Sequence, residues 1–385
     1  MLYFDWTSTS PVSSDALAEY CRVSENYPGN PSSTHALGIK AKEKLEECRK
    51  RFASVIKVAL SELYFTSGGT EADSIVVQSL LNNPSPGEVL FTAVEHAAVL
   101  ENKAVLENHG WKVTLLNCPG GYLDLEALKK ALNPSVRMVC IMKVNNVTGT
   151  VMDTVSAINI IREYSKTTGK YIHIHCDAVQ ALGKIEFHPS EEGFDSAAFS
   201  GHKFSGPRGT GALWCRRTAV QALSRAGGQE SGLRGGTENL PAIAAMTVAL
   251  ENCAGLIDNH YDYVMSLRKK VEDCAAECGF TLLSPSYKSG LSFSPYILTI
   301  SVRPLPSEVF LRVMSDKGFC LSAGSACSAN TRGKAEKVLQ TMGIRSEDRM
   351  SAIRISLSYM NTEEEVESLC KALKDTYKEF GYGKN

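Results

Sequence analysis

The chain has 385 residues, of which 43% are hydrophobic and 22% are charged, values that are ordinary for a globular protein. Its 41 basic and 42 acidic side chains leave a net charge of −1, which excludes bulk attraction to nucleic acid or to an anionic membrane as a basis for function. The first residues lack the basic and apolar regions of a signal peptide, and no apolar run approaches the ~20 residues of a membrane span.

Short apolar runs alternate with amphipathic stretches from about residue 60 onward. Strands are predicted at 62–67, 88–94, 111–117, 136–144, 171–176, 195–200 and 211–215. Helices are predicted between them at 70–81, 97–108, 123–132 and 154–166. This alternation predicts an α/β fold with a mainly parallel sheet and helices on both faces. Ligands of such sheets bind at the carboxyl ends of the strands.

The chain after about residue 255 has a different pattern of predicted helices and strands. The predicted elements are a helix at 258–278, a strand at 296–302, a Ser/Gly-rich loop at 322–333, a strand at 352–357 and a closing helix at 362–380. We therefore expect a large α/β domain over 14–255 and a smaller α+β domain over 256–385. Residues 1–13 are expected to pack on the smaller one.

Ser67-Gly68-Gly69-Thr70-Glu71 falls where a predicted strand turns into a helix. Glycines allow the backbone to approach an anion, and the free N–H groups at the helix start, with the Thr70 hydroxyl, can bind a phosphate. The same residues also suit a simple turn and helix cap, and the motif alone does not decide between the two.

Asp177 follows the predicted strand at 171–176, and Gln180 comes three residues later. A carboxylate in a buried cleft is costly unless a cation meets it, and the protonated pyridine nitrogen of pyridoxal phosphate (PLP) is such a cation. The alternative is an Asp that caps the next helix.

Ser200-Gly201-His202-Lys203 follows the predicted strand at 195–200 and leads into a glycine-rich stretch, 205–211. A lysine on a small-residue turn, beside hydroxyl and imidazole groups, suits a Schiff base, which needs a partly desolvated amine near a phosphate. Taken alone, the motif also fits a surface lysine in a glycine-rich loop.

Twelve cysteines are scattered along the chain without a dense framework, which predicts mostly free thiols and a cytoplasmic location. Cys327 differs from the rest because it lies in a loop of small residues with Arg332 and Lys334 nearby, and exposure and nearby positive charge favour a reactive thiolate. Most cysteines are small core residues, and the loop alone does not exclude that reading. The spacings of Cys274, Cys278, Cys320 and Cys327 match no structural zinc pattern, so no metal is expected.

Taken together, the motifs resemble a known family. In chain order they are Gly29-Asn30-Pro31-Ser32-Ser33 with His35, residues 66–71, Glu95-His96, Val144-Asn145-Asn146 with Gly149, Asp177-Ala178-Val179-Gln180, residues 200–203, Gly235-Gly236-Thr237-Glu238-Asn239, residues 324–328 and Ile353-Arg354-Ile355-Ser356. This set, which covers nearly the whole chain at family-like spacing, is similar to the cysteine desulfurases, which are fold-type I PLP enzymes of the class V aminotransferase family. The chain looks like their long-loop (class I) group, which is associated with nitrogen fixation and iron–sulfur cluster assembly.

The resemblance implies a role for each residue that matches a family motif. Lys203 would carry PLP as an internal aldimine, and His96 would stack on the pyridine ring and take part in proton transfer. Asp177 would pair with the ring nitrogen, and Gln180 would contact the ring hydroxyl. The residues implied for the phosphate and its surroundings are Gly69, Thr70, Ser200, His202 and, from the second subunit of a homodimer, Thr237.

The resemblance also implies how the substrate is handled. Arg354 would bind the carboxylate of L-cysteine as a bidentate fork, with Asn30 and Asn146 close by. Cys327 would attack the substrate sulfur and become a persulfide, leaving L-alanine. The sulfur would then pass to an acceptor protein, either an iron–sulfur scaffold or a thiolation protein.

The N-terminal motif departs from the family pattern. The family usually has Asp-Asn/Tyr-Ala-Ala-Thr-Thr-Pro, whereas this chain has Asp5-Trp6-Thr7-Ser8-Thr9-Ser10-Pro11, with bulkier or more polar residues near the expected substrate position. Ala97, Val147 and Cys176 also differ from the usual residues, although none of them removes a catalytic group.

Two alternatives differ in what they require of the chain. A selenocysteine lyase or another aminotransferase-like enzyme of the same family needs the PLP residues, but a plain aminotransferase needs no thiol at Cys327. A non-catalytic desulfurase-like scaffold needs none of the reactive residues, yet the chain retains Lys203, Asp177, His96 and Arg354.

Overall fold

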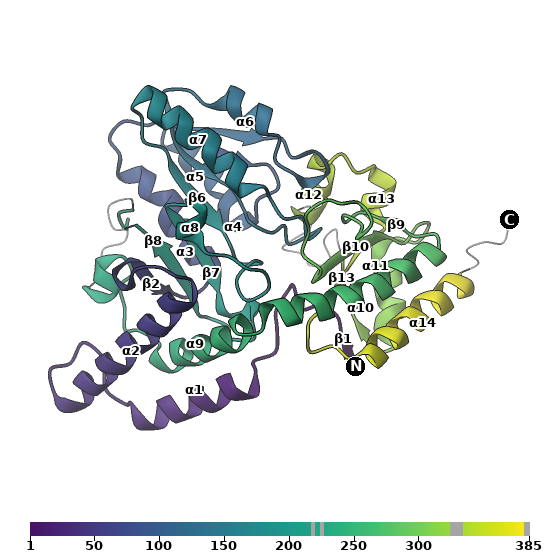
Figure 1. The fold of residues 1–385 in the computed structure, drawn as a ribbon, viewed down its shortest axis with the longest axis horizontal. Coiled ribbons are helices and arrows are strands. Elements are labelled where there is room, and N and C mark those ends of the chain that lie inside the picture. The colour runs from purple at the N-terminus through teal and green to yellow at the C-terminus, as the bar shows by residue number, and fades with distance from the viewer. Residues whose placement is uncertain (217–219, 224–226, 324–333, 381–385) are drawn as a thin grey trace.

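The computed structural model describes residues 1–216, 220–223, 227–323 and 334–380, and these residues form a seven-stranded sheet, a four-stranded sheet and a two-stranded sheet with helices around them (Figure 1). Cys327 and its loop, 324–333, lie outside the described residues. Within the described residues no single helix is long and apolar enough to cross a membrane. Two consecutive helices, 240–254 and 257–277, pass on length and composition only as a pair, and they are bent by 72° at their junction.

Seven strands of the described chain form the large sheet, in the order β2-β8-β7-β6-β5-β3-β4. Their bounds are β2 (Leu63–Thr66), β3 (Glu88–Thr92), β4 (Lys112–Leu116), β5 (Val136–Cys140), β6 (His173–Asp177), β7 (Ser196–Ser200) and β8 (Gly211–Cys215). Strand β8 runs opposite to the other six, so its pairings with β2 and β7 are antiparallel and the rest of the sheet is parallel. The segment from β7 to β8 contains one turn of 3-10 helix, η4 (Gly201–Lys203), and no crossover helix that would allow a parallel return. The prediction of a mainly parallel sheet is confirmed.

Helices cover both faces of this sheet, as the sequence predicts. Alternate residues of one strand enter different cores: Ala197 and Phe199 join one cluster and Ala198 joins the other. The first cluster includes residues of α2 (Ala36–Val55), α7 (Thr154–Thr168) and α9 (Leu240–Ala254), and the second includes residues of α3 (Gly69–Gln78), α4 (Ala97–Leu100) and α5 (Asn102–Asn108). The single helix predicted at 97–108 is therefore wrong in detail, because it is divided at Glu101.

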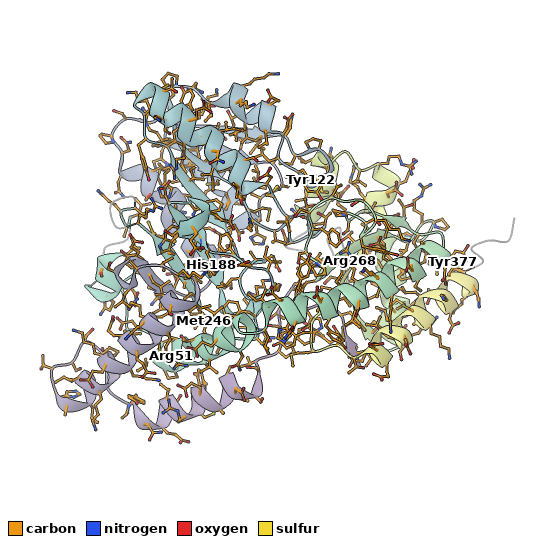
Figure 2. The ribbon with its side chains drawn as sticks, in the orientation of Figure 1. Arg51, Tyr122, His188, Met246, Arg268 and Tyr377 are labelled. Atoms are coloured by element: carbon orange, nitrogen blue, oxygen red, sulfur yellow. The ribbon has the colours of Figure 1, made fainter. Side chains whose placement is uncertain are left out.

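Helix α9 supports the turn that carries Lys203. A Cβ on Gly201 would lie 3.0 Å from Cγ of Met246, which is on the buried side of α9 (Figure 2). Glycine at this position therefore allows the turn to pack closely against the helix. Helix α1 (Ser14–Asn26) packs against the same helix from outside (Figure 1).

The smaller, antiparallel sheet has the order β12-β13-β10-β9. Its strands are β9 (Thr281–Leu282), β10 (Ile297–Ser301), β12 (Ser322–Ala323) and β13 (Ala352–Ser356), and the helices near it are α10 (Ile257–Glu277), α11 (Ser307–Asp316), α12 (Lys334–Thr341), α13 (Ser346–Met350) and α14 (Glu363–Glu379). Arg268 of α10 is fully buried, donates to the carbonyl of Pro285 at 2.6 Å and lies 4.5 Å from the ring centroid of Phe293 (Figure 2). These contacts fix α10 to the segment that connects β9 and β10.

The first thirteen residues touch both parts of the molecule. Strand β1 (Leu2–Tyr3) pairs with β11 (Phe319–Cys320), and the amide of Thr7 donates to Ser356 Oγ at 3.0 Å. Further along, the amide of Ser10 donates to the carbonyl of His202 at 2.8 Å. The N-terminal segment thus links the smaller sheet to the Lys203 turn, while the domain boundaries proposed from sequence remain a prediction.

Candidate active site

A pocket of about 600 Å³ lies at the carboxyl ends of β6 and β7, where a mainly parallel sheet is expected to bind ligands. It brings together residues that are far apart in the sequence. Those predicted from the sequence are Gly69, Thr70, His96, Asn146, Asp177, Gln180, Ser200, His202, Lys203 and Arg354. The pocket also contains residues that were not predicted, namely Thr7, Ser8, Thr9, Asp73 and Arg208 among others.

Two predicted residues lie apart from this pocket. Asn30 and Thr237 are both exposed and are not among its lining residues, and Nδ2 of Asn30 donates to Thr237 Oγ1 at 3.4 Å. Cys327, which carries the predicted persulfide, lies outside the described residues.

The N-terminus of α3 forms one wall of the pocket. No side chain caps this helix end, so its first N–H groups have no side-chain acceptor. A Cβ on Gly69 would lie 2.5 Å from Cγ2 of Val179, so only glycine fits at the first helical position. With the exposed Thr70 beside it, this wall has the backbone donors and the dipole that bind an anion.

His202 and Arg208 lie on the same side of the pocket, and both contact Thr9. His202 Nδ1 lies 3.1 Å from Thr9 Oγ1, and Arg208 Nε donates to the same oxygen at 3.2 Å. Burial, together with the charge of Lys203, lowers the pKa of His202 to about 4, so the imidazole is neutral near pH 7. Because Thr9 Oγ1 accepts from Arg208, its own proton can be donated to Nδ1 of the neutral imidazole. In that tautomer the ring proton is on Nε2, where it can be donated to a ligand.

Asp177 ends strand β6 and is only 5% exposed. One of its carboxylate oxygens accepts from the amide of Val179 at 3.0 Å. Burial raises the pKa of Asp177, and the nearby charges of His96 and Lys203 act in the opposite direction. A carboxyl group in this position would be held ionised by a cation placed against it.

Two further carboxyl groups are buried close to Asp177. Burial and the charge of Asp177 raise the pKa of Asp73 well above its usual value and that of Glu95 to about 8. Glu95 accepts from Thr92 Oγ1 and from the amide of Met142, both at 2.6 Å. Asp73 lines the pocket, and its Oδ2 has no hydrogen-bond partner among the described residues.

Two histidines connect Asp73 to the inside of the sheet. Nε2 of His175 lies 3.0 Å from Asp73 Oδ1, and Ser196 Oγ joins Nδ1 of His175 at 2.8 Å to Nε2 of His173 at 2.7 Å. Burial lowers the pKa of His175 to about 3 and that of His173 to about 4, so both rings are neutral. Because both histidines are neutral, the hydrogen-bonded groups that lead from Asp73 into the sheet supply no positive charge to balance Asp177.

Lys203, at the end of η4, has an unusually low affinity for its proton. Its Nζ donates to the carbonyls of Thr7 at 2.8 Å and Ser8 at 2.7 Å. Burial lowers the pKa of Lys203 to about 8, and the charge of Arg354 acts in the same direction. A useful fraction of the amine is therefore neutral and nucleophilic near physiological pH.

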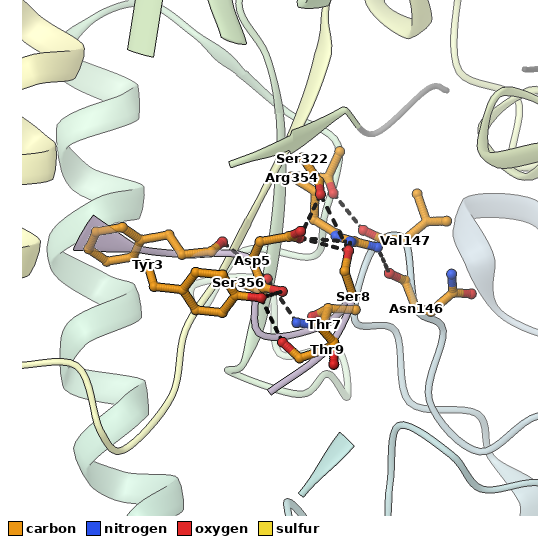
Figure 3. A network of polar contacts seen from close by, with 12 residues as sticks. Tyr3, Asp5, Thr7, Ser8, Thr9, Asn146, Val147, Ser322, Arg354 and Ser356 are labelled. Atoms are coloured by element: carbon orange, nitrogen blue, oxygen red, sulfur yellow. Dashed lines mark hydrogen bonds and ion pairs between the residues drawn. The ribbon is translucent and has the colours of Figure 1, made fainter. Parts of the chain in front are cut away.

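Arg354, on β13, forms the opposite wall and is 9% exposed. Its Nη1 donates to the carbonyl of Asn146 at 2.9 Å, and its Nη2 donates to Ser8 Oγ at 2.6 Å and to Asp5 Oδ1 at 3.2 Å (Figure 3). Its Nε is buried without a partner among the described residues. This guanidinium can bind a carboxylate that enters the pocket.

Gln180 connects the floor of the pocket to the N-terminal segment. Its Nε2 donates to the carbonyl of Thr7 at 3.1 Å, and its Oε1 accepts from Lys184 Nζ at 2.7 Å. Lys184 is itself buried, and burial lowers its pKa to about 7. The contact with Lys184 is local in the sequence, whereas the contact with Thr7 joins residues 173 positions apart and has no local signal.

Comparisons with known proteins agree over the whole chain. The model of the family "Aminotransferase class-V" matches residues 2–369. A protein of Lactobacillus delbrueckii subsp. bulgaricus, described as a NifS/IcsS protein homolog, is 34% identical over 99% of this chain and 98% of its own length. A putative cysteine desulfurase NifS of Bacillus subtilis is 32% identical over 96% of this chain and 93% of its own. A solved structure of a NifS-like protein is 31% identical with a TM-score of 0.90, and the match covers 98% of this chain and 99% of that one.

Proposed function

The chain belongs to the class V aminotransferase family and is a cysteine desulfurase, and from this premise we propose that its pocket binds PLP on Lys203 and L-cysteine on Arg354. The observation that carries the proposal is the set of groups in one pocket. A buried carboxyl group whose pKa is raised by burial, a lysine with a lowered pKa, an anion-binding helix end and a buried guanidinium all face the same space.

The residues present fit the cofactor. Asp177 would pair with the protonated ring nitrogen, and Gln180 would lie near the ring hydroxyl. The helix end at Gly69 and Thr70, with Ser200 and His202, would hold the phosphate. When bound, PLP supplies an electron sink for the substrate's α-carbon.

The remaining steps belong to groups of the chain itself. The neutral amine of Lys203 would bind the cofactor covalently and, once released, accept or return a proton at the substrate's α-carbon. His96 is exposed on the pocket wall and would stack on the cofactor ring and assist proton transfer. Arg354 and Asn146 would hold the substrate's carboxylate end so that its thiol points toward the pocket mouth.

Cys327 is proposed as the acceptor of the sulfur. The carbon–sulfur bond of L-cysteine breaks and a sulfur–sulfur bond forms, so one cysteine and one protein thiol give one alanine and one protein persulfide. The persulfide sulfur would then pass to an acceptor protein, either an iron–sulfur scaffold or a thiolation protein.

We also propose a homodimer and a cytoplasmic location. Asn30 and Thr237 are exposed and lie outside the pocket of their own chain, which supports a role for Thr237 at the phosphate of the second subunit. The eleven cysteines among the described residues are all free thiols, which supports a reducing compartment.

The test is incubation of the PLP-loaded protein with L-cysteine, measuring alanine and protein-bound persulfide together. We expect both in equal amounts in the first turnover, and Cys327→Ser should lose both while it keeps its cofactor. If Cys327→Ser still produced alanine at the wild-type rate, the chain would release sulfur directly, as a lyase does. If neither product formed with wild type, the chain would be a scaffold and the proposal would be wrong.

A further inference from the structure

Ser8 occupies an unusual position between the two reactive cations of the pocket. Its carbonyl accepts from Lys203 Nζ at 2.7 Å, and its hydroxyl oxygen accepts from Arg354 Nη2 at 2.6 Å. The same hydroxyl donates to Asp5 Oδ1 at 2.8 Å. One residue of the N-terminal segment therefore touches both the proposed cofactor-binding amine and the proposed carboxylate-binding guanidinium. Figure 3 shows its contact with the guanidinium.

Asp5 and Ser8 differ in their access to the pocket. Ser8 is a lining residue, whereas Asp5 stands behind it and is not one. Asp5 holds Arg354 through an ion pair of 3.2 Å and also accepts from Ser322 Oγ at 2.5 Å. The negative charge of Asp5 stabilises Arg354 before a ligand binds but repels an incoming carboxylate. The hydroxyl of Ser8 is neutral and can donate to either anion.

Arg354 alone has few free donors for a substrate. Of its five N–H groups, one on Nη1 donates to the carbonyl of Asn146 and the two on Nη2 donate to Ser8 and Asp5, which leaves the buried Nε–H and one N–H of Nη1 for a ligand. A carboxylate has two oxygens, and each prefers its own donor in a buried site. A further donor beside the guanidinium would improve this match, and the Ser8 hydroxyl is a donor on the pocket surface that touches Arg354.

We propose that Ser8 positions the substrate's carboxylate: its hydroxyl holds Arg354 in place and turns its O–H from Asp5 to the carboxylate that enters the pocket. This inference rests on the proposed function and goes beyond it, because it assigns selection for an α-carboxylate to a residue of the N-terminal segment. Serine at this position departs from the alanine of the family pattern, so Ser8→Ala removes one hydroxyl and restores the usual residue.

The test compares ligands with and without a carboxylate. L-cysteine and L-alanine carry the group, and cysteamine is cysteine without it. Binding to the full-length, PLP-loaded protein is followed by the change in visible absorbance and, independently, by calorimetry. Ser8→Ala should weaken binding of L-alanine and raise KM for L-cysteine about tenfold, since a hydrogen bond to a charged group is lost, and should leave kcat and cysteamine binding within about twofold. Ser8→Thr, which keeps the hydroxyl, should restore the affinity.

Ser322→Ala is the matched control. It removes the Ser322 hydroxyl, which donates to Asp5 and lies 3.4 Å from Ser8 Oγ, but it leaves both contacts of Arg354 with Ser8 and Asp5, so L-alanine binding should stay within about twofold of wild type. Equal weakening of L-alanine and cysteamine in Ser8→Ala would show a general structural role and overturn the inference, as would unchanged L-alanine binding. A wild-type protein that takes up PLP but responds to neither ligand would contradict the proposed function, and the inference would fall with it.

Discussion

The two walls of the pocket are built in different ways. The cofactor wall comes from neighbouring strands and one helix end of a single sheet, where Asp177, Ser200 and Gly69 are fixed by the ladder and by close packing. The substrate wall joins Arg354 of the smaller sheet to Asp5 and Ser8 of the N-terminal segment and to Asn146 of a loop. The first wall is set by the pairing of strands within one sheet and by the helix packed on it, whereas the second depends on hydrogen bonds between separate parts of the fold.

This difference gives each wall its own response to mutation. A change in the cofactor wall should alter cofactor binding or the chemical step and leave affinity for the carboxylate intact. A change in the substrate wall should alter affinity for amino-acid ligands and leave the cofactor in place.

The largest effect is expected for Lys203→Ala. Without the amine the protein loses both the covalent attachment and the proposed proton carrier, so alanine production should fall by about 10⁴-fold. The variant loses two hydrogen bonds from the Lys203 amine to backbone carbonyls, but the fold should remain, as circular dichroism would show. Replacement of the exposed Lys170 by alanine serves as the control and should change nothing. A fully active Lys203→Ala would remove the basis of the proposed site.

Asp177→Asn should have the next largest effect. The amide keeps the shape and can still accept from Val179, but it cannot balance a protonated ring nitrogen. We expect kcat to fall by about 10²–10³-fold, the range for removing one well-placed electrostatic partner, while KM for L-cysteine changes little. A large rise in KM with unchanged kcat would show that Asp177 acts on substrate binding, and it would contradict the assignment of Asp177 to the cofactor wall.

Arg354→Lys should act on the opposite wall. Lysine keeps the charge but cannot make the planar fork to a carboxylate, so KM for L-cysteine should rise about 10–100-fold. PLP content, measured by absorbance, should stay at the wild-type level. Loss of the cofactor in this variant would show that the two walls are not separable.

The smallest expected effect is a shift in the pKa of Lys203, which is influenced by Arg354 of the substrate wall. Burial and Arg354 both lower the pKa of Lys203, to about 8, while Asp177 and Asp5 raise it. An amine captures an aldehyde only when it is neutral, so the rate of PLP uptake by the cofactor-free chain should rise with pH and level off above about 8. Arg354→Gln removes a positive charge and should move this midpoint to higher pH. A midpoint that moved to lower pH would contradict the assigned direction.

The sequence predicts the cofactor wall far better than the substrate wall. The strands at 171–176 and 195–200 have strong apolar patterns, and Asp177 and Lys203 follow them directly, so their meeting at one sheet edge is a consequence of parallel topology. Ser8 and Arg354 are separated by 346 positions, and no pattern in the sequence shows that their side chains touch. The only signal was the departure at Thr7 and Ser8 from the family motif.

Other parts of the fold were also beyond local prediction. The antiparallel direction of β8 depends on a connection without a crossover helix, which a strand pattern does not reveal. Helix α9 is buried over most of its surface and lacks the polar stripe that identifies an amphipathic helix. Arg208 lay within the glycine-rich stretch, but its contact with Thr9 depends on the position of the N-terminal segment.

The most direct test of the central claim is to locate the cofactor on the chain. The protein is loaded with PLP, reduced with borohydride to make the attachment permanent, digested and analysed by mass spectrometry. The account predicts one modified peptide that contains Lys203, and no modified peptide in Lys203→Ala. Modification at another lysine, such as the nearby Lys184, with Lys203 unmodified, would contradict it.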